Sequence, residues 1–180
     1  MTVRRIAGVA AVLCSAALLL SFASASGNPK AAAPAGRPDL DRHCVPIGGT
    51  VMTNFGAIDA STTMGTATGD LRGAVSGTLL GAPQPGTGGT LIFHVQHHWV
   101  TETGDTLFFD PATATTAPLP HGLFAILSYP VHLTGGTGRF AGASGELTNI
   151  GEVSLPNAPD VTGGTTIFRY SGQVCFADRD

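Results

Sequence analysis

Three histidines stand close together in the chain, at His94, His97 and His98. Imidazole nitrogens are common metal ligands, so this cluster is the first candidate for a metal site. Apolar and polar residues alternate around it, which predicts a β-strand with His94 and His98 on one face and His97 on the other. Along an extended strand His94 and His98 lie roughly 13 Å apart, too far to share one ion. A metal site would need His121 or His132 as well, so we predict no metal site and expect His94 and His98 to face solvent.

His97 interrupts an otherwise apolar strand face that also carries Phe93 and Trp99. Tyr129 interrupts a later apolar alternation in the same way. If both faces line an interior space, these side chains supply the few polar groups that are typical of small-molecule sites. We therefore take His97, Trp99 and Tyr129 as candidate ligand-binding residues. The alternative is that His97 is a core histidine with its hydrogen bonds satisfied and that Tyr129 lies at the rim.

The sequence carries no signature of a catalytic nucleophile. The segment Gly142–Gly145 contains Ser144, but not with the G-x-S-x-G spacing of a nucleophile elbow. The acids near expected strand ends are Asp105, Asp110, Glu146 and Glu152. Two of them would form an acid–base pair only if the fold brought them together. Catalytic residues therefore remain unassigned.

One segment has the form of a dinucleotide-binding fingerprint. Gly136–Ala141 matches G-x-G-x-x-A, and Asp160 lies about 20 residues further on. That fingerprint has to open a helix, whereas here more glycines follow and no helical period appears. We therefore predict that the chain binds no nucleotide cofactor, and we expect no cofactor of another kind.

Residues 1–25 have the three parts of a secretory signal. Arg4 and Arg5 supply positive charge, Ile6–Leu20 is an almost unbroken apolar run, and Ala23–Ala25 is a small-x-small cleavage site. The apolar run is shorter than the roughly 20 residues that span a bilayer. We expect a protein that is secreted to the extracellular side by bacterial export, with no stable membrane span after cleavage.

The charge of the chain limits its partners. There are nine basic and 12 acidic residues, and the signal contains two of the basic ones, which leaves a formal charge of −5. Lys30 is the only lysine. Because phosphate binding requires clustered lysine and arginine, the chain is a poor candidate for binding nucleic acid or an anionic membrane surface. The partner we expect is a small hydrophobic ligand.

Removal of the signal would also remove Cys14 and leave Cys44 and Cys175. An even number of cysteines in an oxidising compartment predicts one disulfide, which would tie the two ends of the domain together. On the loop-entropy model, closing such a long loop stabilises the fold by roughly 4–5 kcal/mol.

The chain divides by composition into a linker and one domain. Residues 26–43 are rich in Ala, Pro, Gly and charge, which predicts a disordered linker. From Cys44 to Asp180, short apolar alternations between glycine-rich turns predict an all-β domain of seven or eight strands. In Leu123–Leu133 the odd-numbered residues are expected to share one face, and Asp110–Pro120 is expected to be a loop. A sheet of this size must stack or close, and closure removes its exposed edges.

The most distinctive segment is Gly135–Gly145, with the sequence GGTGRFAGASG. It resembles the turn signature of the allene oxide cyclase-like barrels and their dirigent relatives, and Tyr170–Cys175 is similar to the last strand of secreted bacterial members. The resemblance implies an all-β fold with a single eight-stranded antiparallel β-barrel, calycin-like in shape and thus related to lipocalins. It also implies that copies of the chain can self-associate into a homo-oligomer, a dimer or trimer.

We expect this glycine-rich motif to be a structural turn rather than a binding site. Closely spaced glycines permit positive φ angles and close backbone approach. Phe140 would anchor the turn in the core, and Arg139 would donate hydrogen bonds to carbonyls or a carboxylate beneath it. The residues with this structural role are Gly135, Gly136, Gly138, Arg139, Phe140, Gly142 and Gly145.

The resemblance implies a fold without implying a reaction. The plant cyclases convert an unstable fatty-acid epoxide, and dirigent proteins steer phenoxy radical coupling, but the catalytic residues of neither group map onto matching motifs here. Our leading hypothesis is a non-catalytic secreted barrel that binds a small apolar or aromatic molecule in its lumen. One alternative is an isomerase or cyclase-type enzyme on the same barrel. The other is a structural or envelope-interaction module without a ligand, whose barrel would be filled by side chains.

Overall fold

The computed structural model describes residues 43–177, so the expected signal peptide and nearly all of the expected linker lie outside the described residues. The described chain consists of β-strands and short 3-10 turns. Its strands are β1 (His43–Phe55), β2 (Thr62–Ala67), β3 (Gly73–Leu79), β4 (Gln84–Pro85), β5 (Leu91–Thr101), β6 (Thr106–Phe109), β7 (Ala112–Pro118), β8 (Leu123–Ser128), β9 (Pro130–Gly136), β10 (Ser144–Ser154) and β11 (Thr165–Phe176). The 3-10 turns are η1 (Gly69–Leu71), η2 (Thr87–Gly89), η3 (Pro120–Gly122) and η4 (Gly138–Phe140).

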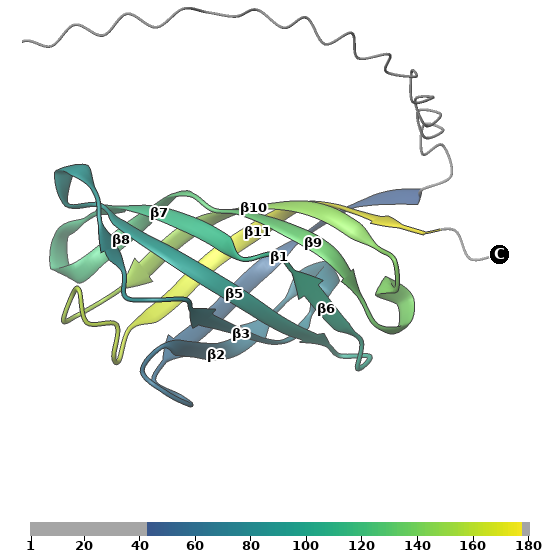
Figure 1. Ribbon diagram of the computed structural model, residues 1–180, viewed down its shortest axis with the longest axis horizontal. Coiled ribbons are helices and arrows are strands. Elements are labelled where there is room, and N and C mark those ends of the chain that lie inside the picture. Colours follow the sequence, from purple (N-terminus) through teal and green to yellow (C-terminus); the bar gives the residue numbers. More distant parts are fainter. Residues whose placement is uncertain (1–42, 178–180) are drawn as a thin grey trace, which may run out of the picture. The chain divides into compact units, whose positions relative to one another are not determined.

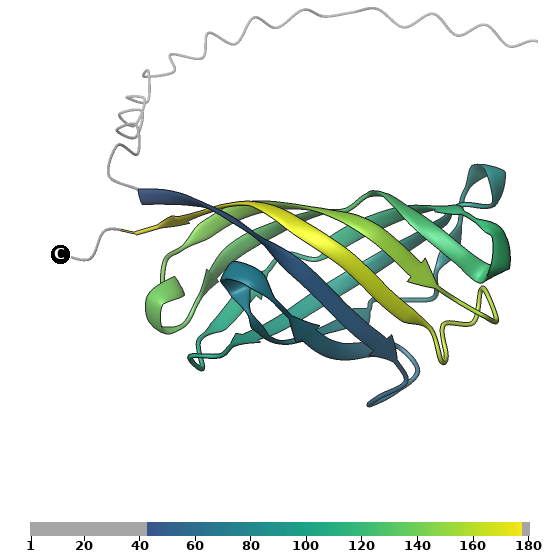
Figure 2. The same ribbon diagram turned by 180° about the vertical axis from the view of Figure 1, so that it is seen from behind.

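The strands form one antiparallel sheet that closes on itself, as seen from two sides in Figure 1 and Figure 2. The order runs from β11 through β1, β2 and β3 to β5. β5 pairs with both β6 and β7. β6 then pairs with β9, and β7 pairs with β8. Both β8 and β9 pair with β10. The pairing of β10 with β11 completes the ring. Because β6 and β7 share one position and β8 and β9 another, the ring has eight positions, and the expected eight-stranded antiparallel barrel is confirmed.

One expectation about the strands is wrong. Asp110–Pro120 was expected to form a loop, but Ala112–Pro118 within it forms β7. The side chains of Ala112, Ala114 and Thr116 are buried in the barrel. Small alanines and β-branched threonines suit a crowded interior but give a weak hydrophobic signal, which is why alternation alone does not reveal this strand.

A second expectation fails at the junction of β8 and β9. The odd-numbered residues of Leu123–Leu133 do not share one face, because Leu127 is exposed while Phe124 and Ile126 are buried. The register between β7 and β8 shifts at this point, which is the mark of a β-bulge. One extra residue moves every later side chain to the opposite face. As a result Tyr129 points inward, in line with the buried side chains of β9.

One end of the barrel is closed by η1, whose Leu71 side chain is buried. The Tyr170 hydroxyl accepts a hydrogen bond from the Leu71 N–H (2.9 Å) and donates one to the Thr68 carbonyl (2.8 Å). The indole N–H of Trp99 donates to the Leu71 carbonyl (2.7 Å). A side chain at Gly69, which has φ of +83°, would overlap the backbone of β1, so only glycine lets η1 pack this closely. We call η1 with Tyr170 and Trp99 the closed end.

The glycine-rich motif also lies at this end, where it turns the chain from β9 into β10 through η4. The Phe140 ring is buried and packs against Phe176, with ring centroids 5.7 Å apart. The Arg139 guanidinium lies over the Phe140 ring and 3.7 Å from the Asp105 carboxylate. Gly138 has φ of +52°, and a side chain there would collide with that carboxylate. These contacts match those expected of a structural turn.

The predicted disulfide between Cys44 and Cys175 is present, and it joins β1 to β11 where the two cysteines are paired across the strands. It links residues 131 positions apart, so it fastens the first strand of the barrel to the last. The adjacent starting and finishing strands are visible at the right of Figure 1.

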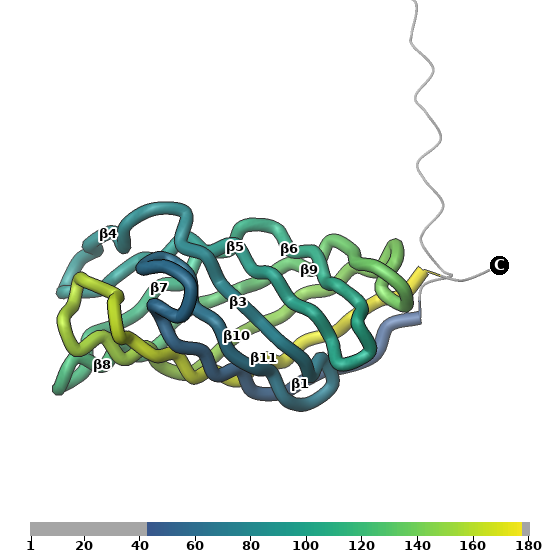
Figure 3. Tube along the Cα trace, turned by 90° about the horizontal axis from the view of Figure 1, so that it is seen from below, coloured from purple at the N-terminus to yellow at the C-terminus, as the bar shows by residue number. Residues whose placement is uncertain are grey.

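The opposite end carries the connections of residues 56–61, 80–90 (which include β4 and η2), 119–122 and 155–164, and its two longest exceed any connection at the closed end. We call it the loop end. Figure 3 shows these connections gathered at the end of the barrel that lies away from the start of β1 and the end of β11. None of the described residues forms a helix long and apolar enough to cross a membrane.

Candidate functional site

A cavity occupies the lumen of the barrel on the side of the loop end. About 50 Å³ of this space is open to the centre of a water molecule. The wall takes residues from every position of the ring, namely Val51, Thr53, Phe55, Thr63, Val75, Gly77, Leu79, Phe93, Val95, His97, Ala114, Ile126, Tyr129, Val153, Thr166 and Phe168. The cavity therefore lies inside the ring of strands and not on its outer surface, and its wall is almost wholly apolar.

A second, smaller cavity lies further toward the closed end. It is lined by His97, Trp99, Phe109, Val131, Leu147, Asn149 and Phe168. His97 and Phe168 line both cavities. These two side chains therefore stand between the space near the loop end and the space near the closed end.

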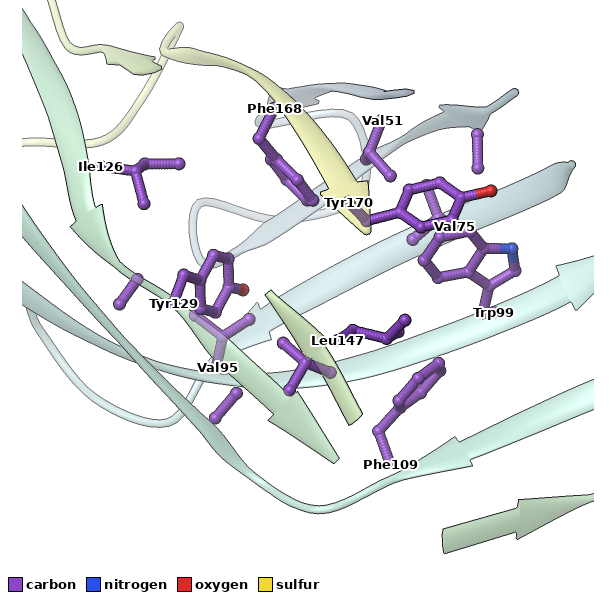
Figure 4. Packing of buried hydrophobic residues seen from close by; sticks show 14 of the residues in the cluster. Val51, Val75, Val95, Trp99, Phe109, Ile126, Tyr129, Leu147, Phe168 and Tyr170 are labelled. Carbon is purple, nitrogen blue, oxygen red and sulfur yellow. The ribbon is translucent and has the colours of Figure 1, made fainter. Parts of the chain in front are cut away.

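The strand alternation of β5 places His97 inside the barrel. Phe93, Val95, His97 and Trp99 are buried on one face of the strand, as expected from the sequence, and His98 is exposed on the other. Tyr129 reaches the same region from the junction of β8 and β9, where the register shift turns it inward. In Figure 4 the Tyr129 ring extends into the interior toward Val95 and Phe168.

The His97 and Tyr129 side chains contact each other directly. The Tyr129 hydroxyl and the His97 Nε2 atom are 2.7 Å apart, which is a short hydrogen bond. The other ring nitrogen, His97 Nδ1, is buried and has no hydrogen-bond partner. Among the buried side-chain nitrogen and oxygen atoms of residues 43–177, it is the one atom in this state. The lumen therefore contains a polar pair that is only partly satisfied.

Burial decides the charge of this pair. It lowers the pKa of His97 from 6.5 to about 4, because an imidazolium ion is poorly solvated in an apolar interior. It raises the pKa of the Tyr129 hydroxyl well above its ordinary value of 10.0 for the same reason. Both groups are therefore neutral at pH 7. No other residue lining the two cavities is ionisable, so the lumen carries no charge at this pH.

Aromatic rings hold the pair in place from both sides. The Phe109 ring meets the His97 ring edge-on at 5.8 Å, and the Phe168 ring meets Tyr129 edge-on at 5.7 Å. The contacts continue from Phe109 to Trp99 and from Trp99 to Tyr170. A column of six rings thus runs from the lumen to the closed end, in the order Phe168, Tyr129, His97, Phe109, Trp99, Tyr170.

The structure brings the three candidate residues to the lumen but gives them different surroundings. His97 and Tyr129 touch each other and line the larger cavity. Trp99 lines only the smaller one, and its indole N–H is already bound to the Leu71 carbonyl. Trp99 is thus part of the closed end and does not line the larger cavity.

Sequence reasoning did not identify Asn149 as a lumen residue. Its side-chain amide donates to the Tyr129 carbonyl (3.0 Å), and its backbone N–H donates to the same oxygen (3.1 Å). Asn149 thus fixes the backbone of Tyr129 at the junction of β8 and β9. The signal available in the sequence is the alternation that places Asn149 on the same strand face as the apolar Leu147.

Hydroxyl groups in the wall are mostly engaged with each other or with the backbone. Thr53 and Thr166 are joined through their hydroxyls at 2.7 Å. The Thr63 hydroxyl donates to the Gly77 carbonyl and accepts from the Gly77 N–H. With these bonds in place, one hydroxyl hydrogen of the Thr53–Thr166 pair and the Nδ1 atom of His97 have no partner among the described residues.

The outward histidines do not form a metal cluster. His94 is hydrogen-bonded to the Thr113 hydroxyl at 3.0 Å, and His132 is paired with Glu146 at 2.7 Å on the outer surface. Within residues 43–177 no three His, Cys, Asp or Glu side chains are grouped in a way that could hold a metal ion.

Comparison with known proteins gives one structural match to report. The chain is similar to the structure of the pterocarpan synthase dirigent protein, with 12% sequence identity and a TM-score of 0.32 over 80% of this chain and 91% of that one. No family model and no curated protein matches the chain. The fold described above rests on the strand pairing itself.

Proposed function

We propose that this protein binds a small, mainly apolar molecule in the lumen of its barrel and that the binding is not coupled to a reaction. The observation that carries the proposal is the apolar lumen cavity lined in part by His97, whose buried Nδ1 atom has no hydrogen-bond partner. Small-molecule sites combine an apolar wall with a few polar groups that set the orientation of the ligand.

The physical case has two parts. Apolar wall atoms favour a ligand body that leaves water, at roughly 25 cal/mol for each Å² buried. A buried polar atom without a partner costs about 1–3 kcal/mol, and a ligand that pairs with it recovers part of that cost. A barrel kept only as a structural module would be expected to fill this space with side chains and to pair its buried polar atoms.

The experiment is a binding screen with a control on the same strand. Native mass spectrometry and the fluorescence of Trp99, the only tryptophan, would be followed against a panel of lipids and phenolic compounds. We expect at least one compound to bind at one molecule per chain, and His97→Phe to weaken it. His98→Phe changes the adjacent, exposed residue and should leave binding unchanged. Absence of binding, or equal binding by both variants, would overturn the proposal.

A second candidate is an isomerase that moves a proton through the His97–Tyr129 pair. The observation that favours it is the buried histidine with a pKa of about 4 beside an open cavity. Incubation of the protein with phenylacetone in D₂O tests it, because proton transfer at the carbon next to the carbonyl would exchange hydrogen for deuterium. Deuterium incorporation that is lost in His97→Phe supports the enzyme, and exchange no faster than in buffer supports a binding protein.

We also propose that the protein acts outside the cytoplasm after export. The disulfide supports this location, since such bonds persist in oxidising compartments. Mass spectrometry of the protein recovered from culture medium should find a chain that begins after residue 25. Recovery of only the uncut chain from the cell interior would contradict export.

A further inference from the structure

The proton on the Tyr129 hydroxyl determines which nitrogen of His97 carries a hydrogen. Within the described chain, His97 Nε2 is the one hydrogen-bond partner of this hydroxyl. If Nε2 were protonated, it would donate to the hydroxyl oxygen, and the hydroxyl proton would have no acceptor. That arrangement would leave two buried polar groups unpaired, and each costs about 1–3 kcal/mol. The arrangement with fewer unpaired groups has the hydroxyl donating to Nε2, which places the ring hydrogen on Nδ1.

This tautomer turns the unpartnered atom into a hydrogen-bond donor. A neutral imidazole has one N–H and one bare nitrogen, and here the bare nitrogen is already used by Tyr129. The Nδ1–H group is therefore the hydrogen-bond donor that His97 can offer to a ligand. The ring lines both cavities, and because Nδ1 itself is shielded by protein atoms, a ligand in either cavity reaches this group only when the His97 ring moves.

The charge of the ligand follows from the rest of the wall. The residues that line the two cavities include no lysine, arginine, aspartate or glutamate. A carboxylate or an ammonium ion placed there would lose its hydration without gaining an opposite charge. A phenol or alcohol would be uncharged, but its own O–H would also need an acceptor, for which the Tyr129 hydroxyl oxygen has capacity left, so such a ligand must form two hydrogen bonds at the pair where a carbonyl forms one.

We propose that the ligand of this lumen is an uncharged molecule with an apolar body and a carbonyl or ether oxygen that accepts a hydrogen bond from the Nδ1–H of His97. The inference rests on the proposed function and names the chemical class of its ligand. It assigns His97 as the binding donor and Tyr129 as the residue that positions its proton.

The tautomer is tested without any ligand by nitrogen-15 NMR of the histidine ring. Protonated and bare ring nitrogens have well-separated chemical shifts, and the His97 signals can be assigned by their loss in His97→Phe. We expect Nδ1 to be protonated and Nε2 to be bare in the unaltered protein. In Tyr129→Phe the hydroxyl is gone, so the two tautomers should become mixed. A protonated Nε2 in the unaltered protein would overturn the assignment.

The ligand class is tested with four single-ring probes of similar size, which are acetophenone, ethylbenzene, phenol and benzoate. Amide shifts in a titration series report both affinity and location. We expect acetophenone to bind about three- to tenfold more tightly than ethylbenzene, as one hydrogen bond predicts. Phenol should bind more weakly than acetophenone, and benzoate should not bind in the lumen. In His97→Phe the ratio of acetophenone to ethylbenzene affinity should fall to about one.

The outcomes separate the two proposals. If ethylbenzene or phenol binds in the lumen at least as tightly as acetophenone, the ligand class is wrong and lumen binding stands. If the ratio is unchanged in His97→Phe, His97 is not the donor. If no probe shifts the amides around the lumen, the proposed function fails and the ligand class fails with it, even where the tautomer is as expected.

Discussion

The closed end and the lumen both bury aromatic side chains with polar atoms, and they treat those atoms differently. At the closed end the Tyr170 hydroxyl makes two hydrogen bonds to the backbone around η1, and the Trp99 indole makes one. In the lumen the Tyr129 hydroxyl makes one bond to His97, whose second nitrogen has none. The first arrangement fixes η1 at its end of the barrel, whereas the second leaves His97, a residue that lines the cavities, with a nitrogen that has no partner. The difference supports the proposed division, in which the closed end stabilises the fold and the lumen binds a ligand.

The largest effect is expected from removing the disulfide near the closed end. On the loop-entropy model, Cys44→Ala with Cys175→Ala should lower the free energy of unfolding by about 4–5 kcal/mol, since the closed loop is very long. Chemical denaturation of the oxidised protein and the double variant measures this. If the lumen is independent of the closed end, ligand affinity in the folded variant should be unchanged. A loss of affinity that parallels the loss of stability would show that the two regions are not independent.

A smaller effect is expected when the solution is acidified, and it arises in the lumen. The pKa of His97 is about 4 in the folded protein and 6.5 when unfolded, so between these values the unfolded chain binds more protons. The free energy of unfolding therefore has its full value, as far as His97 is concerned, above pH 6.5. It falls by roughly 3 kcal/mol as the pH is lowered from 6.5 toward 4.

Unfolding curves between pH 4 and 7 for the unaltered protein and His97→Phe measure this loss. The pKa values of Asp59 and Asp160 are lowered from 3.8 by hydrogen bonds from Ser61 and Thr162, so these carboxylates affect stability below about pH 5 and do not contribute between pH 5 and 7. The variant should have a flatter profile from pH 4 to 6.5. An equally steep profile in His97→Phe would show that the buried histidine is not the cause.

The smallest effects compare the two tyrosines of the chain, one in each region. Tyr170→Phe leaves the Leu71 N–H and the Thr68 carbonyl without their side-chain partner, and should destabilise the fold by about 2–3 kcal/mol. Tyr129→Phe removes one bond to His97 and should destabilise it by about 1 kcal/mol. Thermal or chemical unfolding measures both, and the acetophenone titration should respond to Tyr129→Phe only. The reverse order of stabilities would contradict the assignment of roles.

Much of the fold could be predicted from local sequence pattern. The alternation of Leu91–Trp99 predicts β5 and places His97 on its inner face, because side chains on a strand point to opposite sides in turn. The even pair Cys44 and Cys175 predicts the disulfide. The glycines around Arg139 and Phe140 predict a tight turn.

The site could be predicted only in part, because its geometry depends on how distant strands align. Tyr129 points inward as a result of a register shift between β7 and β8, which the alternation of Leu123–Leu133 does not reveal. The hydrogen bond from Tyr129 to His97 joins residues 32 positions apart. The role of Asn149 likewise depends on the pairing of β10 with β9, which places it beside the Tyr129 carbonyl. Local pattern holds no information on these alignments.

A crystal grown with 4-bromoacetophenone would show whether the lumen holds a ligand through a hydrogen bond from His97. Anomalous scattering locates the bromine without assumptions about the rest of the density. If His97 binds the ligand, one bromine per chain should lie inside the ring of strands, with the carbonyl oxygen within hydrogen-bond distance of His97 Nδ1. Bromine found only on the outer surface, or an empty lumen at a saturating concentration of the probe, would contradict it.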